Sequence, residues 1–439
     1  TKDVRPDATS AFRDYVDGLL DLILPEHKAE IRNYDEEILF LGPDEGTADL
    51  MDSACERARD RGYRYWKGFT TGKAAYLGGV SHIDYGMTTN GIHEYVLGIL
   101  EKLAIDEATV TKVQTGGPDG DLGSNEILIS KDKTIAIIDG GGVLYDPLGL
   151  DRAELSRLAA ARIDSGHFDE KKLSAQGFKV RVSDRNITLP DGTLVVSGAG
   201  LRNSFHLDAR VKADLFVPCG GRPKSIDGTN WQTLIDANGT PKYRFIVEGA
   251  NLFITQDARI ALERKGVLLF KDSSTNKGGV TSSSLEVLSG LAFTDEEFNE
   301  HMVLHDGKEP LFRKKYIEEI VAVVRAKSRA EFEVLWRLHA ETKRPVSELS
   351  DALSAKINEV TTAISRSDLF ADGTLRAAVL ARHIPASLVS RIGMKAIMER
   401  VPENYQKAIV ARTIASTFVY TYGIAPGYED YRAYLASFR

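Results

Sequence analysis

The sequence predicts an α/β protein with a Rossmann-like, doubly wound and mostly parallel sheet, preceded by part of a second domain and followed by a helical C-terminal region. Three observations predict this fold. Short apolar segments alternate with helical patterns through the middle of the chain. A glycine-rich loop, QTGGPDGDLGSN at 114–125, lies between one such segment and a helical pattern. Beyond about residue 293, nearly every segment has helical periodicity.

The N-terminal part of the chain mixes helices, a strand and an irregular loop. Residues 10–31 have apolar residues at helical spacing with a break near Pro25, and the apolar run EEILFL at 36–41 predicts a strand. ADLMDSACERARDRG, ending at Gly62, and MTTNGIHEYVLGILEKL predict helices. The glycine-rich segment between them, KGFTTGKAAYLGGVSHIDYG, predicts a loop.

The middle of the chain supplies the strands of the predicted sheet. Each expected strand is short, apolar and followed by a loop: VTKVQ (110–114), TIAIID (134–139), DLFVP (214–218), FIVEG (245–249) and VLLFK (267–271). Their alternation with helices predicts parallel β/α units. FKVRVSDRNITLPDGTLVV at 178–196 instead alternates around PDG, which predicts a β-hairpin insertion.

Composition narrows the class of protein. The 439 residues include 63 acidic and 56 basic side chains, a formal net charge of -7, and no basic block, which disfavours a nucleic-acid or anionic-membrane role. No apolar run approaches the roughly 20 residues that span a bilayer. Cys55 and Cys219 lie far apart and fit a reducing compartment, the cytoplasm or the mitochondrial matrix. The first residues contain neither an initiator Met nor a signal peptide, so a piece of a longer protein is expected.

The glycine loop predicts a dinucleotide site. In a Rossmann unit the N-terminus of the helix faces the pyrophosphate, and glycines let the backbone approach it. Gly120 and Gly123 supply the later half of such a fingerprint, and Gly117 belongs to a first half that is longer than usual. Asp139 ends the next strand about 20 residues on, where an acid accepts ribose hydroxyls and repels the 2′-phosphate of NADP. NAD is therefore the expected cofactor, although a strand-end Asp can also simply cap a turn.

Two acids in the same loop, Asp119 and Asp121, need an explanation in a site for an anion. We expect them to turn away from the phosphates and cap helix N–H groups. The alternative is a role near the cofactor through water or a cation. No metal site is predicted, because His301 and His305 have helical i, i+4 spacing but lack a visible third ligand.

Long segments of the chain carry a family resemblance: LGPDEGTADLMD (41–52), FTTGKAAYLGGVSHIDYGMTTN (69–90), VTKVQTGGPDGDLGSNEI (110–127), DGGGVLYDPLGLDR (139–152), ADLFVPCGGRP (213–223), FIVEGANLFITQDAR (245–259), KDSSTNKGGVTSSSLEVLSGLAF (271–293) and ERVPENYQKAIVARTIASTFVYTYG (399–423). In this order they resemble the C-terminal catalytic part of the large, fungal-type NAD-specific glutamate dehydrogenases. The resemblance implies oxidative deamination of L-glutamate to 2-oxoglutarate and ammonia with NAD, and the reverse reaction.

The resemblance implies roles for substrate-site residues. It places the proton-transferring carboxylate at Asp44 of GPDE, which by itself could be a helix cap. Thr71 and Ser283 would contact the distal carboxylate of the substrate. Lys73 is either a nearby positive charge or a solvated loop residue, and the sequence leaves both open. The family's catalytic lysines find no match near Lys2 and are expected before Thr1.

The resemblance also implies cofactor contacts. Thr88 would hydrogen-bond the nicotinamide carboxamide, although Thr89 follows it where smaller glutamate dehydrogenases have glycine. Asn251 and Asn276 follow successive strands, at the sheet edge where ligands bind, and an amide suits the carboxamide and ribose. An Asx-turn would explain either asparagine alone.

The implied organisation is part of a substrate domain at 1–85, a Rossmann-like NAD-binding domain at 86–285 with a hairpin insertion near 178–196, and a helical region at 286–439 that packs back on the substrate domain. A homo-oligomer, specifically a tetramer, is expected, with no nucleic-acid or membrane partner. Two other functions stay open: a dehydrogenase of another amino acid, and a non-catalytic NAD-binding or regulatory module.

Overall fold

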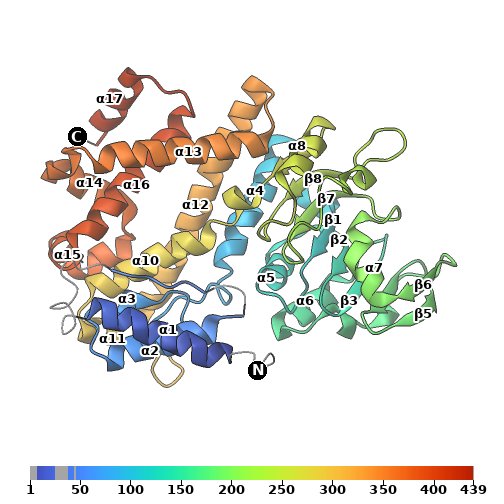
Figure 1. The fold of residues 1–439 in the computed structure, drawn as a ribbon, viewed down its shortest axis with the longest axis horizontal. Coiled ribbons are helices and arrows are strands. Elements are labelled where there is room, and N and C mark those ends of the chain that lie inside the picture. Colours follow the sequence, from blue (N-terminus) through green and yellow to red (C-terminus); the bar gives the residue numbers. More distant parts are fainter. Residues whose placement is uncertain (1–6, 25–37, 44–45, 439) are drawn as a thin grey trace, which may run out of the picture.

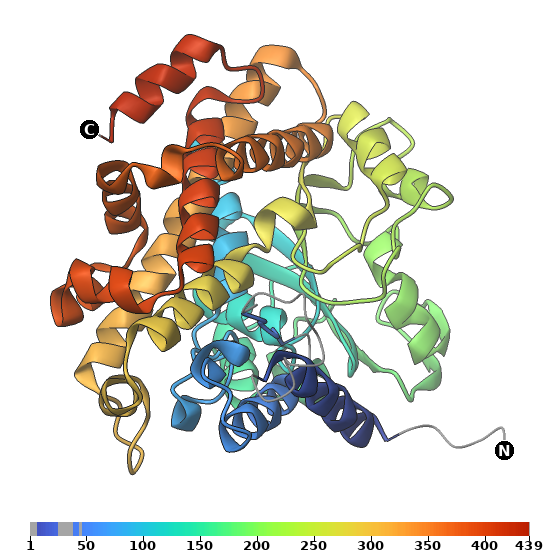
Figure 2. The same cartoon turned by 60° about the vertical axis from the view of Figure 1, so that its left-hand side comes forward.

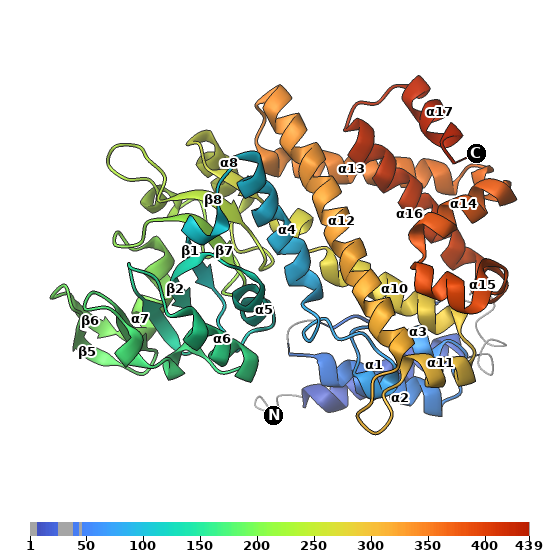
Figure 3. The same ribbon diagram turned by 180° about the vertical axis from the view of Figure 1, so that it is seen from behind.

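The computed structural model describes residues 7–24, 38–43 and 46–438 (Figure 1). One lobe is built around a sheet and the other consists of helices. The long helices α4 (Met87–Lys102) and α12 (Leu311–Thr342) run side by side between the two lobes (Figure 3). None of the helices in the described residues combines the length and apolar character needed to cross a membrane.

The sheet has seven strands in the order β4-β3-β2-β1-β7-β8-β9. Strands β2, β1, β7, β8 and β9 are parallel, and β3 and β4 extend one edge in antiparallel fashion. The strands are β1 (Thr111–Thr115), β2 (Lys133–Ile138), β3 (Gly142–Tyr145), β4 (Phe178–Arg181), β7 (Ala213–Pro218), β8 (Tyr243–Val247) and β9 (Leu268–Phe270). The chain leaves β1 toward one side and returns to β7 on the other, so the strand order reverses between them. Doubly wound sheets bind ligands at such a point.

Both faces of the sheet are covered, because successive side chains of a strand point to opposite faces. In β7, Phe216 packs in one core with Leu262 of α8 (Gln256–Arg264), whereas Val217 packs in another with Tyr95 of α4. On the other half of the sheet, α5 (Asp121–Ile129) and α6 (Arg152–Ala161) pack on β2 and β3. The near-continuous apolar strands predicted from the sequence reflect this burial on both faces.

The helical lobe is assembled around α10 (Gly278–Ala292), α12, α13 (Val346–Ser365) and α16 (Glu403–Tyr422). Figure 2 shows its C-terminal helices, coloured orange to red, gathered away from the green part of the sheet lobe. The start of α13 reaches the sheet lobe, where the Ser347 hydroxyl donates to Glu263 of α8 at 2.5 Å. Other helices of the described residues are α1 (Ala8–Ile23), α2 (Ala48–Asp60), α3 (Trp66–Phe69), α7 (Gly198–Ser204), α9 (Asp272–Thr275), α11 (Asp295–Met302), α14 (Gly373–His383), α15 (Ala386–Arg400) and α17 (Tyr428–Ala436).

Three segments differ from the sequence predictions. Of the strand expected at 36–41, the described part forms only an isolated bridge between Leu41 and Thr70. The hairpin around PDG is formed by β5 (Arg185–Thr188) and β6 (Leu194–Ser197), while β4, the first part of that predicted hairpin, joins the main sheet instead. Strand β3 was not expected, because the glycines that open its sequence favour a loop.

Candidate active site

The glycine loop after β1 forms a close-packed turn at the β1/β7 boundary. Gly116 has a φ of 83°, and a Cβ there would lie 2.6 Å from the Gly220 nitrogen, so the turns after β1 and β7 touch. A Cβ at Gly117 would lie 2.5 Å from Cβ and Cγ of Asp139, and one at Gly123 would lie 2.7 Å from the Gly116 carbonyl carbon. Side chains are therefore excluded at Gly117 and Gly123, as in a loop that holds a pyrophosphate.

The start of α5 leaves its first N–H groups available to an anion. Gly120 is the N-cap residue, and no side chain caps this helix, so the predicted capping by Asp119 and Asp121 is wrong. Asp119 is exposed to solvent. Asp121 is half-buried in the first turn, where a negative charge suits the helix dipole; burial raises its pKa and nearby Arg162 opposes that rise. The arrangement fits the pyrophosphate of a dinucleotide.

The Asp139 carboxylate follows β2 and binds the surrounding backbone. Its Oδ1 accepts from the Gly141 and Gly142 nitrogens at 2.9 and 3.1 Å and from the Ser165 hydroxyl at 2.6 Å. Its Oδ2 accepts from the Ser165 nitrogen at 2.8 Å, which leaves this oxygen capacity for a further bond. Burial raises the pKa of Asp139, and the charge of Asp119 adds to the rise. Asp139 thus caps the β2–β3 turn, and its contact with ribose stays a prediction.

The structure brings Asn251 and Asn276 together at the carboxyl ends of β8 and β9. The Asn276 amide nitrogen donates to Asn251 Oδ1 at 2.7 Å and to the Gly249 carbonyl at 3.0 Å. Among the described residues, the Asn251 amide nitrogen and the Asn276 amide oxygen have no partner. The pair therefore offers a ligand one donor and one acceptor, the complement of a carboxamide.

Thr88 lies at the start of α4, facing the start of α10. A Cβ at Gly278 would lie 2.9 Å from the Met87 carbonyl carbon and from the Thr88 Cα, so the two helix ends meet through glycine. A Cβ at Gly279 would lie 3.0 Å from the Thr88 hydroxyl. Thr89 turns away and donates weakly to the Leu122 carbonyl of α5 at 3.4 Å. The close crossing places Thr88 between the sheet lobe and α10.

Thr71 and Ser283 meet beside this crossing. The Ser283 hydroxyl donates to the Thr71 hydroxyl at 2.9 Å, and it lies 3.2 Å from His82 Nε2. Thr71 is buried in the TGK loop, and Ser283 is on α10. Burial lowers the pKa of His82. Of the three consecutive serines, Ser283 is the one that contacts Thr71, since Ser282 is buried and the Ser284 hydroxyl contacts Tyr405.

Lys73 is buried, which excludes the solvated-loop interpretation. Its ammonium donates to Glu286 Oε1 at 2.6 Å and to the Thr70 carbonyl at 2.9 Å. Both side chains of this ion pair are at most 1% exposed. The other Glu286 oxygen accepts from the Gly72 nitrogen at 2.8 Å, so a single glutamate of α10 holds the TGK loop. The positive charge of Lys73 is thereby balanced inside the protein.

Sequence reasoning missed His82 and Glu286. Both lie in segments with recognisable motifs, but their roles depend on partners about 200 positions away in the chain. Glu286 did carry a signal, because a lone acid in the apolar stretch SSLEVLSG predicts a buried and paired carboxylate. Asp44, the predicted proton-transferring group, lies outside the described residues.

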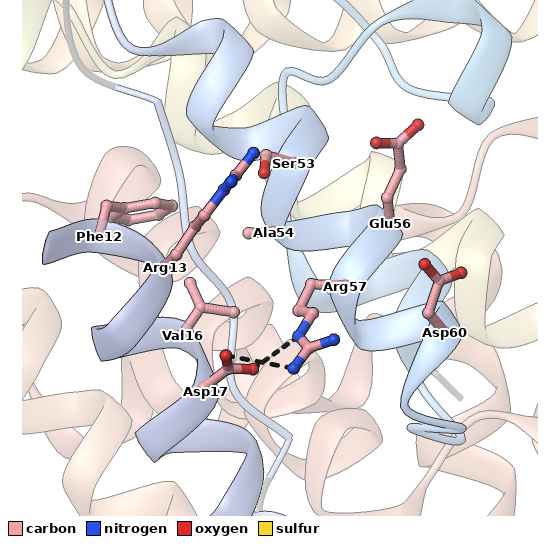
Figure 4. Close-up of a pocket in the computed structure, with 9 residues that line it drawn as sticks. All are labelled: Phe12, Arg13, Val16, Asp17, Ser53, Ala54, Glu56, Arg57 and Asp60. Atoms are coloured by element: carbon pink, nitrogen blue, oxygen red, sulfur yellow. Dashed lines mark hydrogen bonds and ion pairs between the residues drawn. The ribbon is translucent and has the colours of Figure 1, made fainter. Parts of the chain in front are cut away.

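A metal site, a reactive cysteine and a ligand groove find little support in the described residues. The described residues contain no cluster of His, Cys, Asp or Glu suited to a metal. Burial raises the pKa of the Cys219 thiol well above its ordinary value, which supports a structural role. A groove between α1 and α2 is lined largely by charged side chains (Figure 4), and across it Asp17 binds Arg57 through bonds of 2.6 and 3.2 Å. This ion pair joins two helices, and the groove contains no His or Cys.

The fold and the loop geometry define a protein with a Rossmann-type domain, whose glycine loop has the shape of a dinucleotide-binding turn. The family model described as Glutamate/Leucine/Phenylalanine/Valine dehydrogenase matches residues 78–342, and the chain belongs to this family. A crystal structure of Plasmodium falciparum glutamate dehydrogenase shares the fold, with a TM-score of 0.52, 16% identity, and coverage of 79% of this chain and 63% of that one.

Curated relatives are more similar in sequence. The chain is 54% identical over 417 residues to "Glutamate dehydrogenase 2" of Dictyostelium discoideum, and the match covers 95% of this chain and 40% of that protein. It is 49% identical over 424 residues to the "NAD-specific glutamate dehydrogenase" of Neurospora crassa, again covering 95% of this chain and 40% of the relative. The chain thus spans about two fifths of the length of these relatives.

Proposed function

We propose that the protein catalyses NAD-dependent, reversible oxidative deamination of L-glutamate to 2-oxoglutarate and ammonia. The observation that carries the proposal is the contact between Thr71 and Ser283, far apart in sequence and adjacent to the α4–α10 crossing. Such a hydroxyl pair suits a distal carboxylate, and the chain is about half identical to two relatives named glutamate dehydrogenases, of which the Neurospora crassa protein is named NAD-specific.

The dinucleotide would be held by residues that already fit it. Gly117, Gly120 and Gly123 let the pyrophosphate approach α5, while Asn251 and Asn276 supply a donor and an acceptor to the nicotinamide end, beside Thr88. NAD, when bound, supplies the acceptor for the hydride from the substrate Cα. Asp139, buried at the β2–β3 turn, and Asp119, exposed in the loop before α5, place negative charge where a 2′-phosphate would lie, which favours NAD over NADP.

The substrate would be held by Thr71 and Ser283, with Lys73 acting indirectly. Because the Lys73 ammonium is paired with Glu286, it positions the TGK loop rather than binding a carboxylate itself. Asp44 is proposed to move protons at the substrate amine and at the attacking water.

The proposal includes the domain organisation, the oligomeric state and the compartment. Residues 1–85 would be part of the substrate domain, 86–285 the NAD-binding domain, and 286–439 a helical region that completes the substrate side. We propose a homo-oligomer, with a tetramer as the specific expectation, in the cytoplasm or the mitochondrial matrix.

Steady-state reduction of NAD and of NADP by the complete protein, with glutamate, leucine and phenylalanine as substrates, tests the proposal. Glutamate with NAD should be turned over best. For Asp44→Asn we expect nearly normal NAD affinity and a loss of kcat of at least about a hundredfold, as for removal of a general acid–base. Binding of NAD without turnover of any amino acid would instead favour a non-catalytic NAD-binding module. Normal turnover by the Asn variant would remove Asp44 from the mechanism.

A further inference from the structure

His93 on α4 lies between two carboxylates that belong to other elements. Its Nδ1 is 3.4 Å from Glu126 Oε2 on α5, and its Nε2 is 3.5 Å from Glu107 Oε1 in the short turn Glu107–Thr109 before β1. The side chains of His93 and Glu126 are 9% and 0% exposed, and that of Glu107 is 12% exposed. Water and salt therefore screen the charges of this group only weakly.

The surroundings of these atoms identify the charge on the ring. Among the described residues, His93 Nδ1 and Glu126 Oε2 are buried atoms without a hydrogen-bond partner, whereas the other Glu126 oxygen accepts from Lys112 at 3.2 Å. A neutral imidazole carries one N–H, so one of its nitrogens would present a lone pair to a carboxylate. The imidazolium instead directs an N–H toward Glu126 and another toward Glu107.

The charged groups around the ring favour this protonated form. Those that face it in the described part of the chain are Glu126 of α5, Glu107 of the turn and Lys112 of β1. Burial opposes a charge on His93, but the two carboxylates outweigh burial and Lys112, and the pKa of His93 is raised above 6.5. Arginines of α12 that pack on α4 bind other side chains of that helix, Arg325 with Asn90 and Arg329 with Glu94.

The His93–Glu126 pair lies in the contact between α4 and α5. Thr89 and His93 have i, i+4 spacing on α4, as Leu122 and Glu126 have on α5, so each two residues share a helix face. The Thr89 hydroxyl donates to the Leu122 carbonyl at 3.4 Å, and the ion pair follows one turn further along both helices. Because Thr88 and the glycine loop lie at the starts of these helices, the ion pair fixes the two starts relative to each other.

We propose that His93, as an imidazolium held by Glu126 and Glu107, is a positioning residue for NAD, and that NAD binding weakens when this ring loses its proton. The inference rests on the proposed function, which puts the nicotinamide carboxamide at Thr88 and the pyrophosphate at the start of α5. A neutral ring leaves one of the two carboxylates facing a lone pair, and a buried acceptor without a donor costs free energy. Movement of α4 away from α5 relieves that cost and changes the spacing of the two sites that hold the ends of the dinucleotide.

The pH dependence of the NAD Kd, measured by fluorescence titration of the complete protein, tests this role. NAD carries no group that titrates just above neutral pH. In the natural protein the Kd should rise about five- to tenfold as pH is raised through the titration of His93, with a midpoint above 6.5. In His93→Gln, whose amide is uncharged at every pH of the titration, the Kd should stay near the higher value throughout.

Glu107→Gln gives a second readout. It removes one of the two charges that hold the proton, so the midpoint of the rise in Kd should move to lower pH. Its amide oxygen can still accept from the Lys131 nitrogen, a bond of 2.6 Å in the natural protein. The same variant serves if His93→Gln fails to fold, as judged by circular dichroism. The matched control is His305→Gln, exposed in the loop after α11, which should keep the natural Kd and midpoint.

A pH-dependent rise in Kd that persists in His93→Gln, or an unchanged midpoint in Glu107→Gln, overturns the inference, as does a natural Kd that is the same at every pH. In each of these cases, glutamate-dependent reduction of NAD would still support the proposed function. If the natural protein binds no NAD at any pH, both fail.

Discussion

Replacing Glu286 by glutamine leaves the Lys73 ammonium in a buried site without a carboxylate. The two side chains are 1% and 0% exposed and their charged atoms are 2.6 Å apart. Breaking such a pair by removing one partner destabilises a protein by about 3–5 kcal/mol, because the remaining charge stays desolvated. Glutamine can still accept from the Gly72 nitrogen through its amide oxygen, so the predicted loss isolates the ion pair rather than the loop anchor.

Urea unfolding of the protein, followed by circular dichroism, measures this loss. The double variant Lys73→Met/Glu286→Gln removes both charges and should recover most of the stability, since an apolar group tolerates the site that a bare ammonium does not. The matched control is Glu399→Gln in the exposed Lys395–Glu399 pair, which should change the free energy of unfolding by less than about 1 kcal/mol. A single Glu286→Gln variant as stable as the natural protein, or no coupling in the double variant, would refute the reasoning.

Two further predictions concern the cofactor loop and one buried acid. Gly117→Ala should weaken NAD binding at least about tenfold in a fluorescence titration, because a Cβ there would lie 2.5 Å from the Asp139 side chain. The control Gly120→Ala, whose added Cβ would lie 3.6 Å from its nearest atom, should bind NAD nearly as the natural protein does. Equal losses of affinity in the two variants would contradict this account. Burial raises the pKa of Glu263 to about 7 from 4.5, so its contribution to stability is complete below pH 4.5 and is lost as pH rises through 7. In Glu263→Gln the free energy of unfolding should therefore depend less on pH between 4.5 and 7 than in the natural protein. An unchanged pH dependence in this variant would refute the assignment.

Local patterns in the sequence were sufficient to predict the parallel strands and the cofactor loop. The strand at 110–114 and the glycines after it form a sequential unit, so spacing alone indicates the turn and the helix that follows. The apolar segment DLFVP likewise predicts β7, because a strand buried on both faces needs no partner-specific signal.

The features that the sequence did not predict correctly depend on long-range contacts or on competing local preferences. Strand β3 opens with a glycine at φ 150°, a residue that propensity assigns to loops, and only pairing with β2 and β4 makes it extended. The sequence left open whether Lys73 is a nearby positive charge or a solvated loop residue, because its partner, Glu286, is remote in sequence. The same applies to His82, whose neighbour Ser283 is equally remote in sequence. The acids near α5 were expected to cap it, but Gly120 occupies the N-cap position instead.

The i, i+4 spacing of Gly279 and Ser283 fixes the distance between two contact points on one face of α10. One end of this helical turn lies against Thr88, beside the proposed nicotinamide position, and the other carries the hydroxyl proposed for the distal carboxylate. A helix rises about 1.5 Å per residue, so the two points are about 6 Å apart along its axis. A rigid backbone, rather than an adaptable loop, would then set the permitted substrate length. A dicarboxylate shorter or longer by one methylene could satisfy the cofactor end or the carboxylate end, but not both at once.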